Sequence, residues 1–184
     1  VTFSAGLAKA GLVPYCNIYS SFLQRAYDNI RHDVALPKLH VVFCIDRAGI
    51  VGNDGATHHG LLDLAFLRPI PNMAIGAPMT ANDLRQMMRI AKDYDGPIAI
   101  RYPRGKSVNR TDLPPIVLGQ AVCVKPGKEV AVLSIGAIGN TVAEAIQSMN
   151  IGKRNLFAHY DMRWLKPIDE YILKEVVENF DTIV

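Results

Sequence analysis

Arginines, aromatic residues, an acid and histidines follow the apolar runs that the sequence predicts to be β-strands. Tyr19, Phe22 and Arg25 follow one run at the spacing i, i+3, i+6. Asp46-Arg47 follows a second run, and Arg101-Tyr-Pro-Arg-Gly105 follows a third. The carboxyl ends of parallel strands meet at one edge of a sheet, and guanidinium groups bind phosphate through paired hydrogen bonds. These residues therefore predict a pocket for an anionic, phosphorylated small molecule.

A glycine-rich stretch joins the second run to the rest of the chain. Its glycines at 49, 52, 55 and 60 match neither G-x-G-x-x-G nor a Walker A motif, so their spacing alone predicts no phosphate cradle. Asp54 and His58 form either a charge-tuned pair or an ordinary hydrogen bond that holds the loop shut. His58 and His59 cannot both face one metal as i, i+4 ligands do, so we expect no metal site.

Each of these residues also has a purely structural interpretation. On spacing alone Phe22 fits a core position better than a ligand-stacking one, and Arg25 fits a solvated helix face. The cluster of basic residues after the third run fits a solvated linker; it comprises Arg101, Arg104, Lys106 and Arg110. Only their convergence at strand ends favours a binding site.

The elements that must position these residues alternate between strand and helix. Helices are expected over 1–11, from Ser20 or Ser21 to 34, over 81–94 with Thr80 as N-cap, from Gly139 or Asn140 to 149, and over 168–179. Strands are expected over 13–19, 38–45, 73–77, 98–102, 129–135, 156–160 and 181–184. This order predicts an α/β protein with two consecutive parallel-sheet βαβ domains.

The domain boundaries follow from a segment without apolar periodicity that contains three prolines. We expect a first domain over 1–105, a linker over 106–117 and a second domain over 118–184. The first helical pattern has no start signal, so we expect the chain to be part of a longer protein truncated at both ends. Whether a leader peptide has been removed stays open.

Composition excludes several classes of protein. Hydrophobic residues make up 49% and charged residues 20%, which excludes extensive disorder. The net charge of +3 is too small to indicate a nucleic-acid partner, and no apolar run approaches the ~18 residues of a membrane span. Three distant cysteines, Cys16, Cys44 and Cys123, predict buried reduced thiols in a reducing compartment. The sequon Asn109-Arg110-Thr111 is interpreted as chance.

Long contiguous motifs resemble those of a known family. They are Tyr19-Ser-Ser-Phe-Leu-Gln-Arg-Ala-Tyr-Asp28 with His32-Asp-Val34, Ile45-Asp-Arg-Ala-Gly-Ile-Val-Gly-Asn-Asp-Gly-Ala-Thr-His58, Asp95-Gly-Pro97 with Arg101 to Gly105, and Tyr160-Asp-Met-Arg-Trp-Leu-Lys-Pro-Ile-Asp169. Over essentially its whole length the chain resembles the 1-deoxy-D-xylulose-5-phosphate synthases of the transketolase-like, thiamine-diphosphate superfamily. The resemblance makes residues 1–105 the pyrimidine-binding domain and residues from 118 the start of the transketolase C-terminal domain.

The resemblance implies a transketolase-type transferase that condenses pyruvate with D-glyceraldehyde 3-phosphate and releases carbon dioxide. This reaction opens the non-mevalonate isoprenoid pathway, and its product also feeds thiamine biosynthesis. The implied cofactors are thiamine diphosphate, which carries the carbon chemistry, and Mg²⁺, whose ligands belong to an N-terminal domain absent from this sequence. A homodimer is implied, in the bacterial cytoplasm or, after removal of a transit peptide, in a plastid.

The resemblance also assigns cofactor and substrate roles to residues of this chain. Phe22 matches the aromatic residue that packs on the aminopyrimidine, and Arg25 lines the cofactor site. Tyr19, Arg47 and Arg104 match residues that engage the aldehyde, with the arginines on its phosphate.

Asp54 and His58 match catalytic polar residues, with His58 as a proton shuttle or substrate donor near neutral pH. The glutamate that activates the cofactor in this family would lie upstream of Val1, and we expect the chain alone to be inactive. His59 stands where the family often has glutamine. Two alternatives remain: a split transketolase half or 2-oxo-acid dehydrogenase β-like subunit, and a non-catalytic subunit that keeps the fold.

Overall fold

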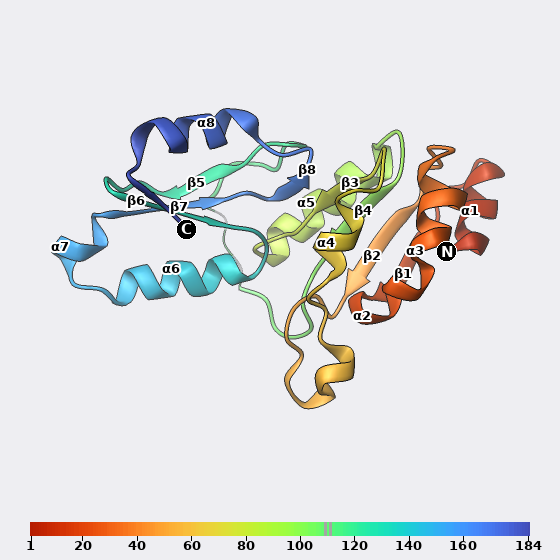
Figure 1. The fold of residues 1–184 in the computed structure, drawn as a ribbon, viewed down its shortest axis with the longest axis horizontal. Coiled ribbons are helices and arrows are strands. Elements are labelled where there is room, and N and C mark those ends of the chain that lie inside the picture. The colour runs from red at the N-terminus through yellow and green to blue at the C-terminus, as the bar shows by residue number, and fades with distance from the viewer. Residues whose placement is uncertain (109, 111) are drawn as a thin grey trace.

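The computed structural model describes residues 1–108, 110 and 112–184, and it contains two α/β units that lie side by side (Figure 1). Its α-helices are α1 (Thr2–Lys9), α2 (Ser20–Leu23), α3 (Tyr27–Asn29), α4 (Asp63–Leu67), α5 (Ala81–Asp93), α6 (Ile138–Ser148), α7 (Ile151–Arg154) and α8 (Glu170–Asn179). Its strands are β1 (Tyr15–Tyr19), β2 (Val42–Asp46), β3 (Ala74–Gly76), β4 (Ile98–Arg101), β5 (Val122–Lys125), β6 (Val130–Ser134), β7 (Phe157–Asp161), β8 (Trp164–Lys166) and β9 (Thr182–Ile183). The α/β class expected from the sequence is confirmed.

The first sheet has the strand order β1-β2-β4-β3-β8. Strands β1 to β4 are parallel to their neighbours, whereas β8 pairs antiparallel with β3. Strands β1 to β4 thus follow the expected parallel arrangement, and β8 departs from it because a strand from the second half of the chain returns to the edge of the first sheet. By sequence β8 lies within 118–184, but by pairing it belongs with the first unit.

The second sheet has the order β5-β7-β6-β9, and helices α6 and α8 cover its opposite faces (Figure 1). Here β5 pairs antiparallel with β7, while β6 pairs parallel with β7 and β9. Neither β5, β8 nor the short helix α7 was expected from the apolar pattern.

The helix expected after β1 is broken into several turns. It runs through α2, a 3-10 turn (Gln24–Ala26), α3 and a π-helical turn (Ile30–Ala35). Neither serine caps it: the N-cap is Tyr19 without a side-chain bond, and the hydroxyls of Ser20 and Ser21 have no partner among the described residues. Ile30, Val34 and Ala35 are the buried residues of the π turn; Ile30 and Val34 keep the i, i+4 spacing, and the wider turn adds Ala35 to the same face.

Helix α5 follows its sequence signals closely. Thr80 accepts a hydrogen bond from the Asp83 backbone N–H at 3.1 Å, and Asp83 accepts one from the Thr80 N–H at 2.9 Å. This capping box confirms Thr80 as N-cap. Met87 and Ala91 are fully buried on the inner face, as the spacing predicts.

Both faces of the first sheet are covered by apolar side chains. Trp164 of β8 is fully buried in the cluster that also contains Met87 and Cys44. Gly76 lies directly against it, since a Cβ there would come within 2.8 Å of the indole ring. The prediction of buried thiols holds for Cys44 but was wrong for Cys123, which is exposed. All three cysteines are free.

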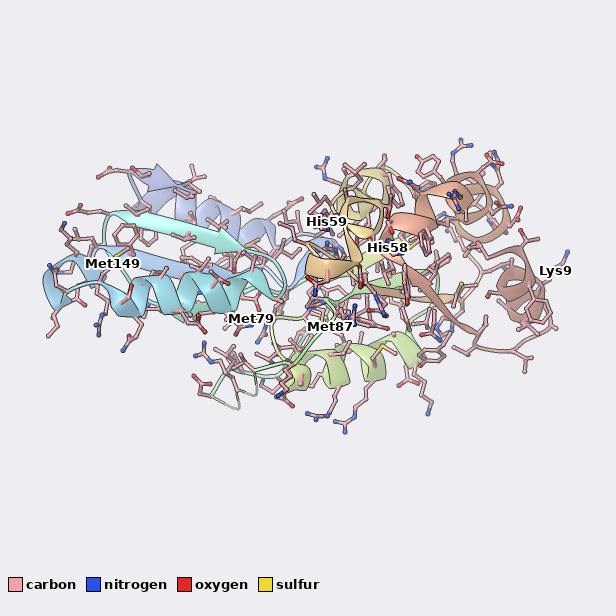
Figure 2. All side chains as sticks on the ribbon, turned by 90° about the horizontal axis from the view of Figure 1, so that it is seen from below. Lys9, His58, His59, Met79, Met87 and Met149 are labelled. Atoms are coloured by element: carbon pink, nitrogen blue, oxygen red, sulfur yellow. The ribbon has the colours of Figure 1, made fainter. Side chains whose placement is uncertain are left out.

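Between β4 and β5, the described residues of the segment 106–117 form no helix or strand. Backbone carbonyls of Pro114 and Pro115 accept hydrogen bonds from the Arg163 guanidinium, and the Ile116 N–H donates to Gln86 of α5, so this segment is held by both halves of the chain. Met79, labelled in Figure 2, lies between the units, where its carbonyl accepts a hydrogen bond from Asn140 at 2.7 Å. Two positions of the sequon, 109 and 111, lie outside the described residues. Within the described residues no helix has the length and apolarity to cross a membrane.

Candidate active site

The carboxyl ends of β1, β2 and β4 lie level with one another at one edge of the first sheet. In the strand register Tyr19 pairs with Asp46, and Ile45 pairs with Arg101. The loop 47–60 projects from this edge, below the sheet in Figure 1. The structure thus brings together the three strand ends on which the predicted pocket depends.

Three aromatic rings gather at this edge. Tyr19 and Phe22 stack with centroids 5.3 Å apart and an angle of 11° between their planes. His58 packs edge-on against Phe22 at 5.2 Å and against Tyr19 at 6.4 Å. In Figure 2, which views the molecule from below, the loop with His58 and His59 lies toward the viewer. The core interpretation of Phe22 is wrong, because 39% of this residue is exposed.

Arg47 is held over Tyr19 by its neighbour Asp46. The Asp46 carboxylate accepts a hydrogen bond from the Arg47 backbone N–H at 2.6 Å and another from its Nη1. The backbone of Arg47 has φ = 57°, in the left-handed region that a non-glycine residue adopts at a cost. Its guanidinium carbon lies 4.1 Å from the centroid of the Tyr19 ring, a cation–π contact.

Arg104, three residues after the end of β4, reaches the same group of residues. Its Nη1 donates to both carboxylate oxygens of Asp54, at 2.6 and 2.7 Å. This contact holds the pKa of Asp54 below its usual range, and the charges of Arg47 and His58 act in the same direction. The sequence left open a hydrogen bond between Asp54 and His58, and the structure does not contain it. Asp54 instead accepts from Arg104, and the His58 Nδ1 bonds the Thr57 hydroxyl at 2.9 Å.

The remaining predicted residues have other environments. Arg25 is exposed on the 3-10 turn Gln24–Ala26, and among the described residues it makes no ion pair or side-chain hydrogen bond. The basic cluster is not one patch, because Arg101 pairs with buried Asp63 and Arg110 pairs with Asp112. The sequence analysis did not single out Asp63. Its sequence shows only an acidic residue near the start of a short apolar segment, which does not indicate an ion pair.

A cavity of about 540 Å³ adjoins this edge and extends to the second unit. Asp46, Tyr102 and Arg104 line it from the first unit, and Ala137 and Asn140 line it from the second. Burial raises the pKa of Tyr102 to about 12, so this side chain stays a neutral hydrogen-bonding group. The cavity is large enough for a small metabolite.

Within residues 1–108, 110 and 112–184 no group of three or more His, Cys, Asp or Glu side chains could hold a metal ion. An aromatic cofactor ring fits the edge better, because Phe22 presents exposed ring surface beside polar His58 and Arg47. The edge thus presents aromatic ring surface, two guanidinium groups and an imidazole side by side.

Residues 1–108 match the family described as transketolase, pyrimidine binding domain, and the chain belongs to this family. It is 53% identical to the 1-deoxy-D-xylulose-5-phosphate synthase of Parabacteroides distasonis, over 100% of this chain and 30% of that protein. It is 54% identical to the same enzyme of Bacteroides fragilis, over 100% of this chain and 29% of that protein. The chain thus spans about 30% of the length of the curated relatives it matches.

Solved structures show the same fold. A split-gene transketolase, described as an inactive "beta4" tetramer, superposes with a TM-score of 0.84 at 30% identity, over 98% of this chain and 59% of that one. The transketolase of Campylobacter jejuni superposes with a TM-score of 0.81 at 18% identity, over 98% of this chain and 32% of that one. The transketolase-like fold inferred from the motifs is confirmed.

Proposed function

We propose that this chain forms the pyrimidine-binding part of a 1-deoxy-D-xylulose-5-phosphate synthase, which condenses pyruvate with D-glyceraldehyde 3-phosphate and releases carbon dioxide. The observation that carries this proposal is the 53% identity over the whole chain to a synthase of that name. The split-gene transketolase shares the fold but only 30% of the sequence, which favours the synthase over a split transketolase half.

The residues at the strand ends are suited to thiamine diphosphate. Exposed ring surface on Phe22 would pack against the pyrimidine, with Arg25 at the rim of that site. When bound, this cofactor supplies a carbon nucleophile and an acceptor for the electrons released on decarboxylation. The protein itself would orient the cofactor ring and hold charged side chains close to the reacting atoms.

Arg47 and Arg104 would bind the phosphate of the aldehyde substrate, beside Tyr19. Each guanidinium already bonds a carboxylate, of Asp46 and Asp54 respectively, so each is oriented before the substrate arrives. The Arg104 side chain is 54% exposed, and an exposed ion pair contributes little. A phosphate dianion can therefore replace the Asp54 carboxylate at low cost.

His58 would move a proton to or from the reacting oxygen. It lies against Tyr19 and Phe22, where substrate and cofactor would meet. Its Nδ1 bonds the Thr57 hydroxyl, which fixes the ring orientation. Asp54 lies in the same loop and contributes negative charge near His58.

The proposal extends to the assembly of the synthase. Magnesium would be bound by parts of the protein other than this chain, and the protein would act as a homodimer in the cytoplasm. Several exposed apolar side chains near the first helix and edge strand β1 support self-association: Phe3, Leu12, Val13 and Tyr15. Sedimentation of the full-length protein as a monomer at micromolar concentration would contradict this part.

The test uses the full-length protein that carries this chain, assayed for 1-deoxy-D-xylulose 5-phosphate. Arg104→Ala is expected to raise KM for glyceraldehyde 3-phosphate about tenfold or more, through lost charged hydrogen bonds, and KM for pyruvate much less. It should also reduce the preference for this aldehyde over unphosphorylated glyceraldehyde. Arg89→Ala, an exposed arginine on α5, is the matched control. No product from the wild type would refute the synthase; equal changes in all constants would refute the phosphate role.

A further inference from the structure

The loop that carries Asp54 and His58 is closed at its base by glycines. Gly49 and Gly60 exchange two backbone hydrogen bonds, each 2.8 Å long. Gly60 is packed so tightly that an added Cβ would lie 2.3 Å from the Arg47 carbonyl oxygen and 2.5 Å from Ser20. The base of the loop therefore touches the residues next to Tyr19 on one side and Arg47 itself on the other.

A buried ion pair holds this base to the sheet. Arg101 at the end of β4 donates from Nε to Asp63 Oδ2 at 2.6 Å and from Nη2 to Asp63 Oδ1 at 3.1 Å. The same Nη2 donates to the Gly60 carbonyl at 3.1 Å. Asp63 is fully buried and the Arg101 side chain is only 14% exposed. A single guanidinium thus binds the loop's last residue and the first turn of α4.

The segment 101–104 consequently holds the loop at two places. Arg101 fixes its base through a buried pair, and Arg104 fixes its tip through Asp54 in an exposed pair. The exposed contact can open when an anion binds, because it is weak in water. The buried contact cannot exchange with solvent ligands, and losing one partner would leave an unpaired buried charge.

We infer that Arg101 and Asp63 are positioning residues of the active site. They hold the base of the loop so that His58 lies against Tyr19 and Phe22, and Asp54 lies within reach of Arg104. Neither residue lines the cavity of about 540 Å³. Arg101 acts through the Gly60 carbonyl, and Asp63 acts through Arg101. The kinetic part of this inference rests on the proposed synthase function, whereas the structural part does not.

Hydrogen exchange and kinetics of the full-length protein test this inference. In Arg101→Lys, which keeps the charge but loses the paired geometry, amide exchange in residues 49–60 is expected to rise about tenfold, with exchange elsewhere unchanged. Catalytic efficiency with glyceraldehyde 3-phosphate is expected to fall about tenfold or more, since small displacements of catalytic groups are costly. Asp63→Asn should do the same; if it does not fold, Arg101→Lys carries the test.

Arg163→Lys is the matched control. This arginine is also buried and also donates to backbone carbonyls, but it lies away from the loop, so exchange in 49–60 should stay at the wild-type level. Loop exchange that is unchanged in Arg101→Lys, or that rises equally in the control, overturns the inference. A looser loop with wild-type kinetics overturns its catalytic part. A looser loop in a protein that makes no deoxyxylulose phosphate refutes the proposed function and leaves the positioning intact.

Discussion

Two buried titratable side chains on β7 are expected to give opposite pH dependences of stability. His159 and Asp161 are both fully buried, and burial lowers the pKa of His159 to about 4 and raises the pKa of Asp161 to about 7. Arg163 offsets this burial only in part: its backbone N–H donates to Asp161 Oδ1 at 3.1 Å and its charge also lowers the pKa of Asp161, but its guanidinium donates to Pro114 and Pro115 and its Nε lies 4.0 Å from the carboxylate. Among the described residues Asp161 Oδ2 has no hydrogen-bond partner.

The signs follow from proton binding in the folded and unfolded states. An unfolded histidine binds a proton below about pH 6.5, whereas folded His159 stays neutral down to about pH 4, so this residue makes stability rise with pH. Folded Asp161 keeps its proton up to about pH 7, whereas an unfolded aspartate loses it near pH 3.8, so this residue makes stability fall with pH. Each contributes about 1.4 kcal/mol per pH unit between about pH 4 and 6.5, and the two nearly cancel.

Removing one member of this pair should therefore uncover the other. In Asp161→Asn the free energy of unfolding is expected to rise by about 3 kcal/mol more than in wild type between about pH 4 and 6.5, and in His159→Gln to fall by a similar amount. Urea unfolding at several pH values measures these slopes, with the single tryptophan, Trp164, as the fluorescent reporter. Other titrating groups contribute equally to all three proteins. A wild-type pH dependence in Asp161→Asn would mean that this carboxylate is ionised in the folded protein, and the reasoning from burial would be refuted.

Gly60→Ala is expected to cost about 1–3 kcal/mol and most of the activity, because its Cβ would meet backbone 2.3 Å away. Thermal unfolding tests this, with Gly152→Ala as the control. Gly152 is a helical glycine in open space, where alanine should stabilise by about 0.5–1 kcal/mol. A Gly60→Ala protein with wild-type stability would contradict the packing argument. Thr80→Ala removes the α5 cap and should lower stability by about 1 kcal/mol in the same assay. Unchanged stability would mean that another group caps the helix. A thiol reagent should modify exposed Cys123 in the folded protein and Cys44 only on unfolding, since burial raises the pKa of the Cys44 thiol to about 11; early modification of Cys44 by mass spectrometry would count against this.

The parts of the fold that were predicted from the sequence are those with local causes. Thr80 caps α5 through Asp83, three positions away, and the strands ending at Tyr19, Asp46 and Arg101 are apolar runs with polar ends. The antiparallel strand β8 was missed because it is three residues long and its pairing partner, β3, lies about 90 positions earlier in the chain. No local pattern encodes such a pairing.

The arginines between 101 and 110 show the same limit within the site. By type and spacing they form one basic cluster, yet each pairs with a different carboxylate. Arg101 bonds Asp63 at a sequence separation of 38, Arg104 bonds Asp54 at a separation of 50, and Arg110 bonds Asp112 at a separation of 2. Burial then separates the two pairs for which we propose functions. The Arg101–Asp63 pair is enclosed, as a positioning contact requires, and the Arg104–Asp54 pair is exposed, as exchange of its carboxylate for an anion requires. A sequence pattern can therefore predict that charge gathers at a strand end, but only the fold decides which charge is structural and which is available to a substrate.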